Sequence, residues 1–460
     1  MGRSMAAVLL LAASCTNPGP GDRERSVAAT PLISASKGAG TPQNEARMVP
    51  MMDHHQHLLS PAALVLEARP TLPQVKVPAE IAELLKQRAE RTADADRLAL
   101  LYSEDVLLHG FGEGGWIRGN RDAAEFISST FAPGYRLTPV SYRNRGALVE
   151  VAGYYTRGEG AMLRHPGYFS MNLVKDRAGS WRIAAETPVF PGPLVLKQID
   201  GKALVEMLDL AGIKRAVVLS NAYWFDRAEK GPKQYEQVRA ENDWTAEQVA
   251  MFPDRLIGFC SFSPLADYAL TELERCAAKP QFKGLKLHLG SSGVDLTKPD
   301  QAAKVRRVVE AANRLKLPVI AHLTATRDYG RKHSEIFLSE ILPAAPDIPV
   351  IIAHLWGGAA YSDDALSVYV DAIKAGHPAT KNLYFEVAQA SLVEGNNDSN
   401  LRKIAERIRE IGLDRILYGS DGAMPPGLAP TKMWADFRVK VPLTDDEFRR
   451  IANNVLPGLQ

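Results

Sequence analysis

From about residue 200 onward, short apolar runs alternate with amphipathic helical patterns, and this alternation constrains the fold more than any other feature of the chain. The apolar runs have the length and the β-branched and aromatic content of buried strands. They occupy residues 214–221, 256–263, 282–290, 317–323, 348–356, 382–388 and 415–421. The segments between them carry one apolar face, as in residues 401–411, where leucine and isoleucine recur every three or four positions. Repeated strand–helix units predict a parallel sheet covered by helices.

An eighth strand is expected close to the N-terminus, in the segment MVPMMDHH at residues 48–55. Eight strand–helix units predict a (β/α)8 TIM barrel, with a doubly wound sheet as the alternative. Every predicted strand carries a polar or ionisable residue at or near its carboxyl end. This favours the barrel, because a barrel carries its chemistry at the carboxyl ends of its strands.

Residues 77–190 interrupt this pattern between the first strand and the helix expected at residues 201–213. Helical patterns and then strand-like runs of alternating polarity occupy residues 78–92, 93–105, 119–131, 146–158 and 168–186. The order of helices before sheet, closed by the motif GSWRI, resembles the NTF2-like (SnoaL-like) cone fold. The resemblance implies an inserted α+β domain, so that the barrel consists of residues 47–76 and 191–460.

The first 46 residues are expected to lie outside the folded domains. Arg3 is the only charge before an apolar run that ends at Ala13, and the segment LAASC closes at Cys15. This pattern predicts a signal peptide over residues 1–15, too short to span a bilayer as a mature helix. It resembles a bacterial lipobox, which implies lipidation of Cys15 and a place in the periplasm or at the outer membrane; an ordinary cleaved signal or a misassigned start is the alternative. Residues 16–46 are rich in Pro, Gly, Ser and Thr and predict a flexible linker.

The composition excludes several classes of partner. Lys and Arg total 55 against 53 Asp and Glu, which leaves a formal charge of +2 without a block of like charge. This argues against nucleic acid and against a polybasic membrane surface. We expect a small-molecule substrate and membrane contact only through the N-terminal lipid anchor, and the sequence leaves a homo-oligomer open. Cys260 and Cys276 occupy apolar positions and predict no disulfide framework.

The segment DHHQH at residues 53–57 places three histidines within four positions. Alternate side chains of a strand share a face, so Asp53, His55 and His57 are predicted to point one way and His54 the other. Two neutral imidazoles suit Zn²⁺ or a similar ion, and Asp53 is placed to orient one of the rings. An HxH pair alone is weak evidence, with simple packing as the alternative.

Further histidines fall at the ends of other predicted strands. His288, His322 and His354 each lie at the carboxyl end of a predicted strand, and Asp421 ends the last strand. The carboxyl ends of barrel strands surround one opening. The sequence therefore predicts that these side chains gather with the HxH pair around a divalent ion.

The motifs that carry these residues resemble the amidohydrolase superfamily, in particular its aminocarboxymuconate-semialdehyde-decarboxylase-like branch. They are DxHxH on the first strand, PVIAH ending at His322, PVIIAH ending at His354, and YGSD ending at Asp421. The resemblance covers residues 47–60 and 199–460. It implies one divalent ion, taken as Zn²⁺, with His354 as the catalytic histidine beside it. The implied metal ligands are His55, His57, His322 and Asp421.

Three histidines and one carboxylate leave one coordination position open, which is typical of a catalytic rather than a structural metal site. Such an ion lowers the pKa of a bound water from 15.7 toward roughly 7. In this interpretation Asp421 takes the proton of the water, and His354 polarises the substrate carbonyl.

Other residues near the strand ends have less certain roles. Lys286 shares a face of its strand with His288, so it could be carbamylated and bridge a second metal, or simply pair with a carboxylate; one metal is favoured. His288 is expected to bind substrate or to support a metal ligand.

Loop residues complete the set of candidates. Arg327 could bind a substrate carboxylate with its planar fork, or remain solvated. Asn221 and Trp356 are expected near the substrate, with packing beneath the rim as the alternative. Glu386 ends a strand as either a catalytic group or half of a buried ion pair.

The site favours a metal-dependent hydrolase acting on an amide, ester or lactone, because hydrolysis needs only the open metal position. The alternative is a metal-dependent, non-oxidative decarboxylase on the same site. A second alternative is a small-molecule-binding protein that uses a pocket in the NTF2-like insertion, for which Tyr102, Asp105 and His109 are the polar candidates.

Overall fold

The computed structural model describes residues 48–65, 72–109, 116–158, 164–189, 197–227, 232–324, 329–358, 361–391, 398–422 and 429–459. The predicted signal peptide with Cys15, the predicted linker and Arg327 lie outside the described residues. Among the described residues, no helix combines the length and the apolar character needed to cross a membrane.

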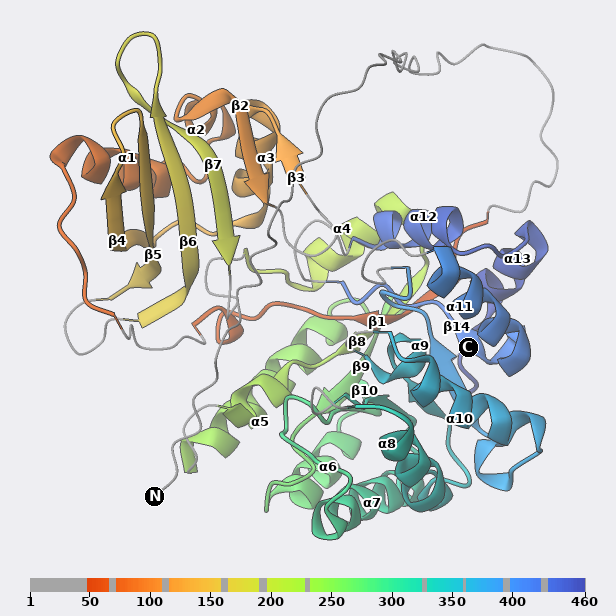
Figure 1. Cartoon of the computed structure of the whole chain (residues 1–460). Helices are drawn as coiled ribbons and strands as arrows, with labels where there is room; N and C mark the ends of the chain where they lie inside the picture. The colour runs from red at the N-terminus through yellow and green to blue at the C-terminus, as the bar shows by residue number, and fades with distance from the viewer. Residues whose placement is uncertain are drawn as a thin grey trace. The chain divides into compact units, whose positions relative to one another are not determined.

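Within the described residues, one eight-stranded sheet is built from parallel neighbours in the order β1-β8-β9-β10-β11-β12-β13-β14. Figure 1 labels β1, β8, β9, β10 and β14 of this sheet. Its strands are β1 (Met52–Gln56), β8 (Arg215–Leu219), β9 (Leu256–Ser261), β10 (Phe282–His288), β11 (Val319–His322), β12 (Val350–Ile352), β13 (Leu383–Glu386) and β14 (Ile416–Leu417). The first and last strands meet, because the backbone N–H of His54 donates to the Tyr418 carbonyl at 2.8 Å and that of Asp421 donates to the His55 carbonyl at 2.8 Å. The sheet is therefore closed, and the predicted TIM barrel is confirmed.

Helices follow the strands. They are α4 (Gly201–Ala211), α5 (Pro232–Ala250), α6 (Ala269–Ala277), α7 (Pro299–Arg314), α8 (Arg331–Ile336), α9 (His354–Gly357), α10 (Asp363–Lys374), α11 (Asp398–Ile411), α12 (Pro430–Lys440) and α13 (Asp445–Asn453). In α11 the apolar positions of the predicted periodic face, such as Leu401, Ile404 and Ile408, are buried, and the charged positions between them face outward. Burial of each aliphatic side chain contributes about 1.5–3 kcal/mol, which is why the periodic pattern fixes which face of the helix packs inward.

The amino end of the barrel is closed by the segment that follows α13. Leu456 and Leu459 are 1% and 5% exposed and pack with Met52, Val217 and Ile257 inside the barrel. The Leu456 N–H also donates to His54 Nε2 at 3.2 Å. With this end filled by side chains, chemistry is confined to the carboxyl ends of the strands.

The residues between β1 and α4 form a six-stranded sheet in the order β3-β2-β7-β6-β5-β4, together with three helices. The elements are α1 (Ala79–Glu90), α2 (Ala95–Ala99), β2 (Tyr102–His109), β3 (Trp116–Arg118), α3 (Asn120–Thr130), β4 (Arg136–Asn144), β5 (Leu148–Arg157), β6 (Arg164–Lys175) and β7 (Trp181–Val189). An inserted α+β unit is thereby confirmed; its likeness to the NTF2-like cone stays a prediction.

The helix predicted over residues 93–105 is wrong in its second half. The helix α2 ends at Ala99, and β2 starts at Tyr102. Val106 and Leu108 are buried on one face of β2, which pairs with both β3 and β7. Pairing with two neighbouring strands outweighs the local helical preference of the segment.

A buried ion pair lies in the interior of this insertion. Arg88 and Glu186 have no exposed surface, and the guanidinium donates to both carboxylate oxygens at 2.7 and 3.1 Å. The hydroxyls of Tyr102 and Tyr155 donate to the same carboxylate at 2.6 and 3.4 Å. Tyr102, which the sequence suggested for a ligand pocket, is therefore part of a saturated structural network.

Candidate metal centre

The two outer histidines of DHHQH converge with the aspartate that follows β14. His55 and His57 are 1% and 5% exposed, and their Nε2 atoms lie 3.3 Å apart. Asp421 Oδ1 lies 3.2 Å from His55 Nε2 and 3.4 Å from His57 Nε2. Ligand atoms bound tetrahedrally to zinc at about 2.0–2.1 Å are separated by about 3.3 Å, so this triangle has the size that one ion requires.

The hydrogen bonds of the ring Nδ1 atoms decide what each imidazole offers to the centre. His55 Nδ1 donates to Glu386 Oε1 at 2.8 Å, His57 Nδ1 to the Leu219 carbonyl at 2.9 Å, and His354 Nδ1 to the Ala388 carbonyl at 3.1 Å. These partners only accept, so each Nδ1 carries the proton and each Nε2 presents a lone pair. The lone pairs of His55 and His57 at 3.3 Å repel each other unless a cation or proton lies between them. This donor set fits a divalent metal ion.

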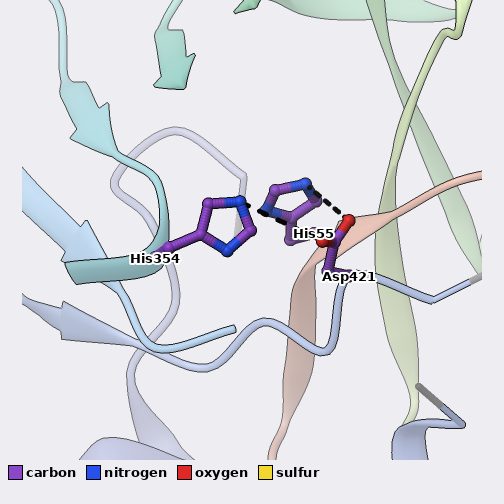
Figure 2. Close-up of side chains that lie close together, drawn as sticks. All are labelled: His55, His354 and Asp421. Atoms are coloured by element: carbon purple, nitrogen blue, oxygen red, sulfur yellow. Dashed lines mark ion pairs between the residues drawn. The ribbon is translucent and has the colours of Figure 1, made fainter. Parts of the chain in front are cut away.

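His354 belongs to the same group. Among the described residues, ligand atoms of His55, His354 and Asp421 all lie within 4.8 Å of one another, and Figure 2 shows the two rings and the carboxylate gathered together. His354 Nε2 lies 4.0 Å from Asp421 Oδ2. The residue predicted to act in catalysis is therefore also within reach of the ion.

His322, a predicted ligand, is placed differently. Its ring stacks on His288 with centroids 3.9 Å apart and meets the His354 ring edge-on at 4.9 Å. The group of ligand atoms within 4.8 Å contains His354 rather than His322, as found among the described residues. The structure thus brings together His55, His57 and Asp421, and a metal-ligand role for His322 stays a prediction.

The backbone is strained where these residues emerge from their strands. His354, Leu355, Gln389 and Asp421 have φ between 55° and 62°, a region that side chains other than glycine rarely adopt. Each such residue costs about 1–3 kcal/mol and persists only where its surroundings hold it. For Asp421 this is the backbone bond to His55, and for His354 it is a bond from its N–H to Glu386 Oε1 at 2.7 Å.

Asp53 does not orient an imidazole ring, contrary to the prediction. Its Oδ1 accepts from the backbone N–H of His55 at 3.1 Å and of Ser420 at 3.0 Å, and its Oδ2 accepts from Gln56 Nε2 at 2.8 Å. The pairing of β1 with β8 shifts register between Asp53 and Gln56, so strict alternation of side chains fails there. Asp53 holds the main chain of the first and last strands, and burial raises its pKa to about 6.

Glu386, rather than Asp53, is the carboxylate that contacts an imidazole ring of the centre. It has no exposed surface and contacts the His55 ring, as described above. Burial alone would raise its pKa, but the electrostatic attraction and hydrogen bond of the His55 ring and the bond from the His354 N–H outweigh burial and lower the pKa of Glu386 to about 2. The sequence signal for this residue was only its position at a strand end.

Lys286 lies next to the His55 ring of the centre. Its Nζ is 3.3 Å from His55 Nε2, and the residue is 1% exposed. Burial lowers the pKa of Lys286 to about 8, against the opposing charges of Asp421 and Glu386. An amine this close to the ligand atoms supplies a positive charge that partly balances the two carboxylates.

His288 differs from the other rim histidines. Its ring stands between Tyr223, stacked at 4.7 Å, and His322. The N–H of Ser291 donates to His288 Nδ1 at 3.1 Å, so a neutral His288 carries its proton on Nε2. In this tautomer Nε2 presents an N–H rather than a lone pair, and the predicted role of His288 in binding substrate or supporting a metal ligand stays a prediction.

The two loop candidates have mixed outcomes. Asn221 Nδ2 donates to the Leu58 carbonyl at 2.6 Å, while its Oδ1 is buried and has no hydrogen-bond partner within the described part of the chain. Trp356 is 3% exposed and packs edge-on against Tyr361 at 5.0 Å, within the layer between the barrel and its helices. The ring of Trp356 is thus packed against apolar neighbours, as in the alternative reading, and its predicted place near the substrate stays a prediction.

The comparisons place this chain in a family. A family model described as amidohydrolase matches residues 209–454, more than half of the sequence. The chain belongs to the amidohydrolase family, which confirms the resemblance.

Similar proteins include several decarboxylases. The gamma-resorcylate decarboxylase of Polaromonas sp. is 24% identical over 246 residues, which cover 47% of this chain and 75% of that protein. The crystal structure of 2,6-dihydroxybenzoate decarboxylase from Rhizobium matches with 18% identity and a TM-score of 0.41, covering 56% of this chain and 87% of that one. That of 5-carboxyvanillate decarboxylase from Sphingomonas paucimobilis matches with 18% identity and a TM-score of 0.39, covering 54% and 79%.

Proposed function

We propose that the chain is a metal-dependent, non-oxidative decarboxylase that removes CO₂ from a small hydroxy-substituted aromatic acid. The observation that carries the metal dependence is the convergence of the His55, His57 and Asp421 ligand atoms at 3.2–3.4 Å. The similarity to gamma-resorcylate decarboxylase supports decarboxylation rather than the hydrolysis favoured by the sequence analysis.

The proposed ligands are His55, His57 and Asp421 with His322 or His354 as the fourth, and zinc is the proposed ion. When bound, the ion supplies a Lewis acid that holds substrate oxygen atoms and stabilises negative charge on them. His288 is proposed to donate a hydrogen bond from its Nε2–H to a substrate oxygen. Arg327, outside the described residues, is proposed to bind a carboxylate.

The proton transfer is assigned to the pair of His354 and Asp421. His354 Nε2 faces Asp421 Oδ2 at 4.0 Å, while its Nδ1–H is held by the Ala388 carbonyl. A proton carried by this pair goes to the ring carbon that bears the carboxylate. The bond from that carbon to the carboxylate then breaks, its electron pair returns to the ring, and CO₂ leaves. The overall change is R–CO₂⁻ plus H⁺ to R–H plus CO₂.

Decarboxylation can be tested with 2,6-dihydroxybenzoate and its isomers in D₂O, with zinc or manganese supplied. We expect CO₂ release together with one deuterium at the vacated ring carbon. His354→Asn should abolish both, whereas His377→Asn, at an exposed position after α10, should not change either. Metal-dependent hydrolysis of amides, esters or lactones without CO₂ release would establish the hydrolase instead.

We also propose that the chain is exported and lipid-anchored through Cys15. The support for this proposal is the sequence pattern of residues 1–15. Expressed with its N-terminus in a bacterial host, the wild type is expected in the membrane fraction with a lipid mass at Cys15. The variant Cys15→Ala should lose both, and a wild type found in the cytoplasm without lipid would refute the proposal.

The insertion at residues 77–190 is proposed to be accessory to the barrel.

A further inference from the structure

We propose that Glu386 is a positioning residue: its carboxylate holds the ring of His55 and the main chain of His354 in one arrangement and thereby sets how tightly the centre binds a divalent ion. This inference rests on the metal centre of the proposed function, but not on which reaction it performs.

The hydrogen bonds of Glu386 are short and come from three segments of chain. Oε1 accepts from His55 Nδ1 at 2.8 Å and from the His354 N–H at 2.7 Å, and Oε2 accepts from the Ala388 N–H at 2.6 Å. The side chain is fully buried at the end of β13. A carboxylate with no water contact and three donors has one favourable position, so it fixes the groups that donate to it.

His55 is distinguished from the neighbouring histidines by this partner. The Nδ1 atoms of His57 and His354 donate to neutral backbone carbonyls, whereas that of His55 donates to a carboxylate. A carboxylate partner fixes the tautomer and makes the other ring nitrogen a stronger ligand. His55 should therefore be the imidazole whose binding to the ion depends most on a side chain of a different strand.

The same oxygen restrains His354. His354 has a φ of 55°, and its N–H donates to the atom that also holds His55. A charge-assisted hydrogen bond is roughly twice as strong as a neutral one, which is enough to offset part of the strain. Loss of the carboxylate would release the two histidines together.

Gly419 shows that space is kept for this contact. A Cβ on Gly419 would lie 2.5 Å from Glu386 Oε2 and 2.8 Å from the His55 Cβ. Its φ is not in the left-handed region, so the backbone itself would accept alanine. The glycine of the YGSD motif is therefore required by the packing of Glu386 against His55.

The test is the affinity of the full chain for Zn²⁺, measured by competition with a coloured chelator without substrate. Glu386→Gln keeps the shape but cannot accept all three bonds, because one of its two end groups is now a donor. We expect its affinity to fall by about 10–100-fold. Glu241→Gln is the matched control, since Glu241 is a 1% exposed glutamate of the same barrel that bonds Ser60 instead, and its affinity should not change.

Two further measurements separate positioning from general damage. Gly419→Ala should weaken Zn²⁺ binding in the same direction, and the double variant should lose less than the product of the two single losses. The visible spectrum of Co²⁺ bound in place of zinc should change in Glu386→Gln and not in Glu241→Gln. If Glu386→Gln does not fold, Gly419→Ala alone carries the test.

Wild-type affinity and an unchanged Co²⁺ spectrum in Glu386→Gln would overturn the inference, as would a wild type that binds no divalent ion. If the wild type binds Zn²⁺ with an affinity that depends on Glu386 but releases no CO₂, the proposed reaction is refuted and this inference still holds.

Discussion

Glu241 on α5 should make the stability of the barrel depend on pH. It is 1% exposed and accepts a hydrogen bond from Ser60 Oγ at 2.5 Å. Burial raises the pKa of Glu241 from 4.5 to about 7, and the Ser60 bond opposes only part of this rise. The folded state therefore binds a proton that the unfolded state has lost between these two values.

The sign and size of the effect follow from this difference. The pKa of Glu241 is higher in the folded state than in the unfolded state. The contribution of Glu241 to the free energy of unfolding is therefore fully present below pH 4.5 and is lost as the pH rises toward 7. A shift of about 2.5 pKa units at 1.36 kcal/mol per unit amounts to about 3 kcal/mol. Glu241→Gln keeps the buried polar group but removes the ionisation, so this variant should lack that pH dependence.

The assay is urea denaturation of the wild type and of Glu241→Gln at a series of pH values from 5 to 8. The difference in the free energy of unfolding should grow with pH by up to about 3 kcal/mol in favour of the glutamine variant. Other titrating groups cancel in this difference. A difference that stays constant across the series would refute the reasoning, since it would mean that Glu241 ionises in the folded protein as easily as in water.

Three other perturbations have definite expected results. Arg88→Met should lower the free energy of unfolding of the insertion by about 3–5 kcal/mol in urea, because it leaves the Glu186 carboxylate buried without its partner; a loss below about 1 kcal/mol would contradict this. Leu456→Ala should cost about 2–5 kcal/mol in a thermal or urea melt, whereas Val439→Ala, at a position 85% exposed, should cost little. His57→Ala should reduce bound zinc well below one per chain by elemental analysis, and full occupancy would remove His57 from the ligands.

The strands of the barrel could be predicted because their sequence pattern is local. Apolar runs such as residues 282–290 and 317–323 contain β10 and β11, and β8 to β14 all lie within their predicted runs, whereas β1 ends one residue beyond the predicted segment 48–55. The carboxyl ends of the first and last predicted strands also indicated where His55, His57 and Asp421 would meet. Parallel order and closure then follow from the repeated units.

The errors have non-local causes. The segment at residues 93–105 has a helical composition, and only pairing with β7, more than 70 residues later, makes its second half a strand. Asp53 contacts main chain instead of an imidazole because a register shift in β1 cannot be read from alternation of residues.

The residues of the site do not by themselves determine whether the protein catalyses hydrolysis or decarboxylation. Hydrolysis and decarboxylation can use the same ion, the same histidines and the same aspartate. The similarity to gamma-resorcylate decarboxylase is the observation that favours decarboxylation in the proposal.

Closure of the barrel depends on contacts between opposite ends of the chain. His54 bonds residues 364 and 402 positions further along, on the last strand and on the terminal segment. Joining such distant partners is slow, because the intervening chain must surrender much of its freedom first. A nascent chain that stops before residue 411 would hence leave its first strand without a neighbour on one side, so the cation-binding residues should gather only after residues 416–421 have joined β1.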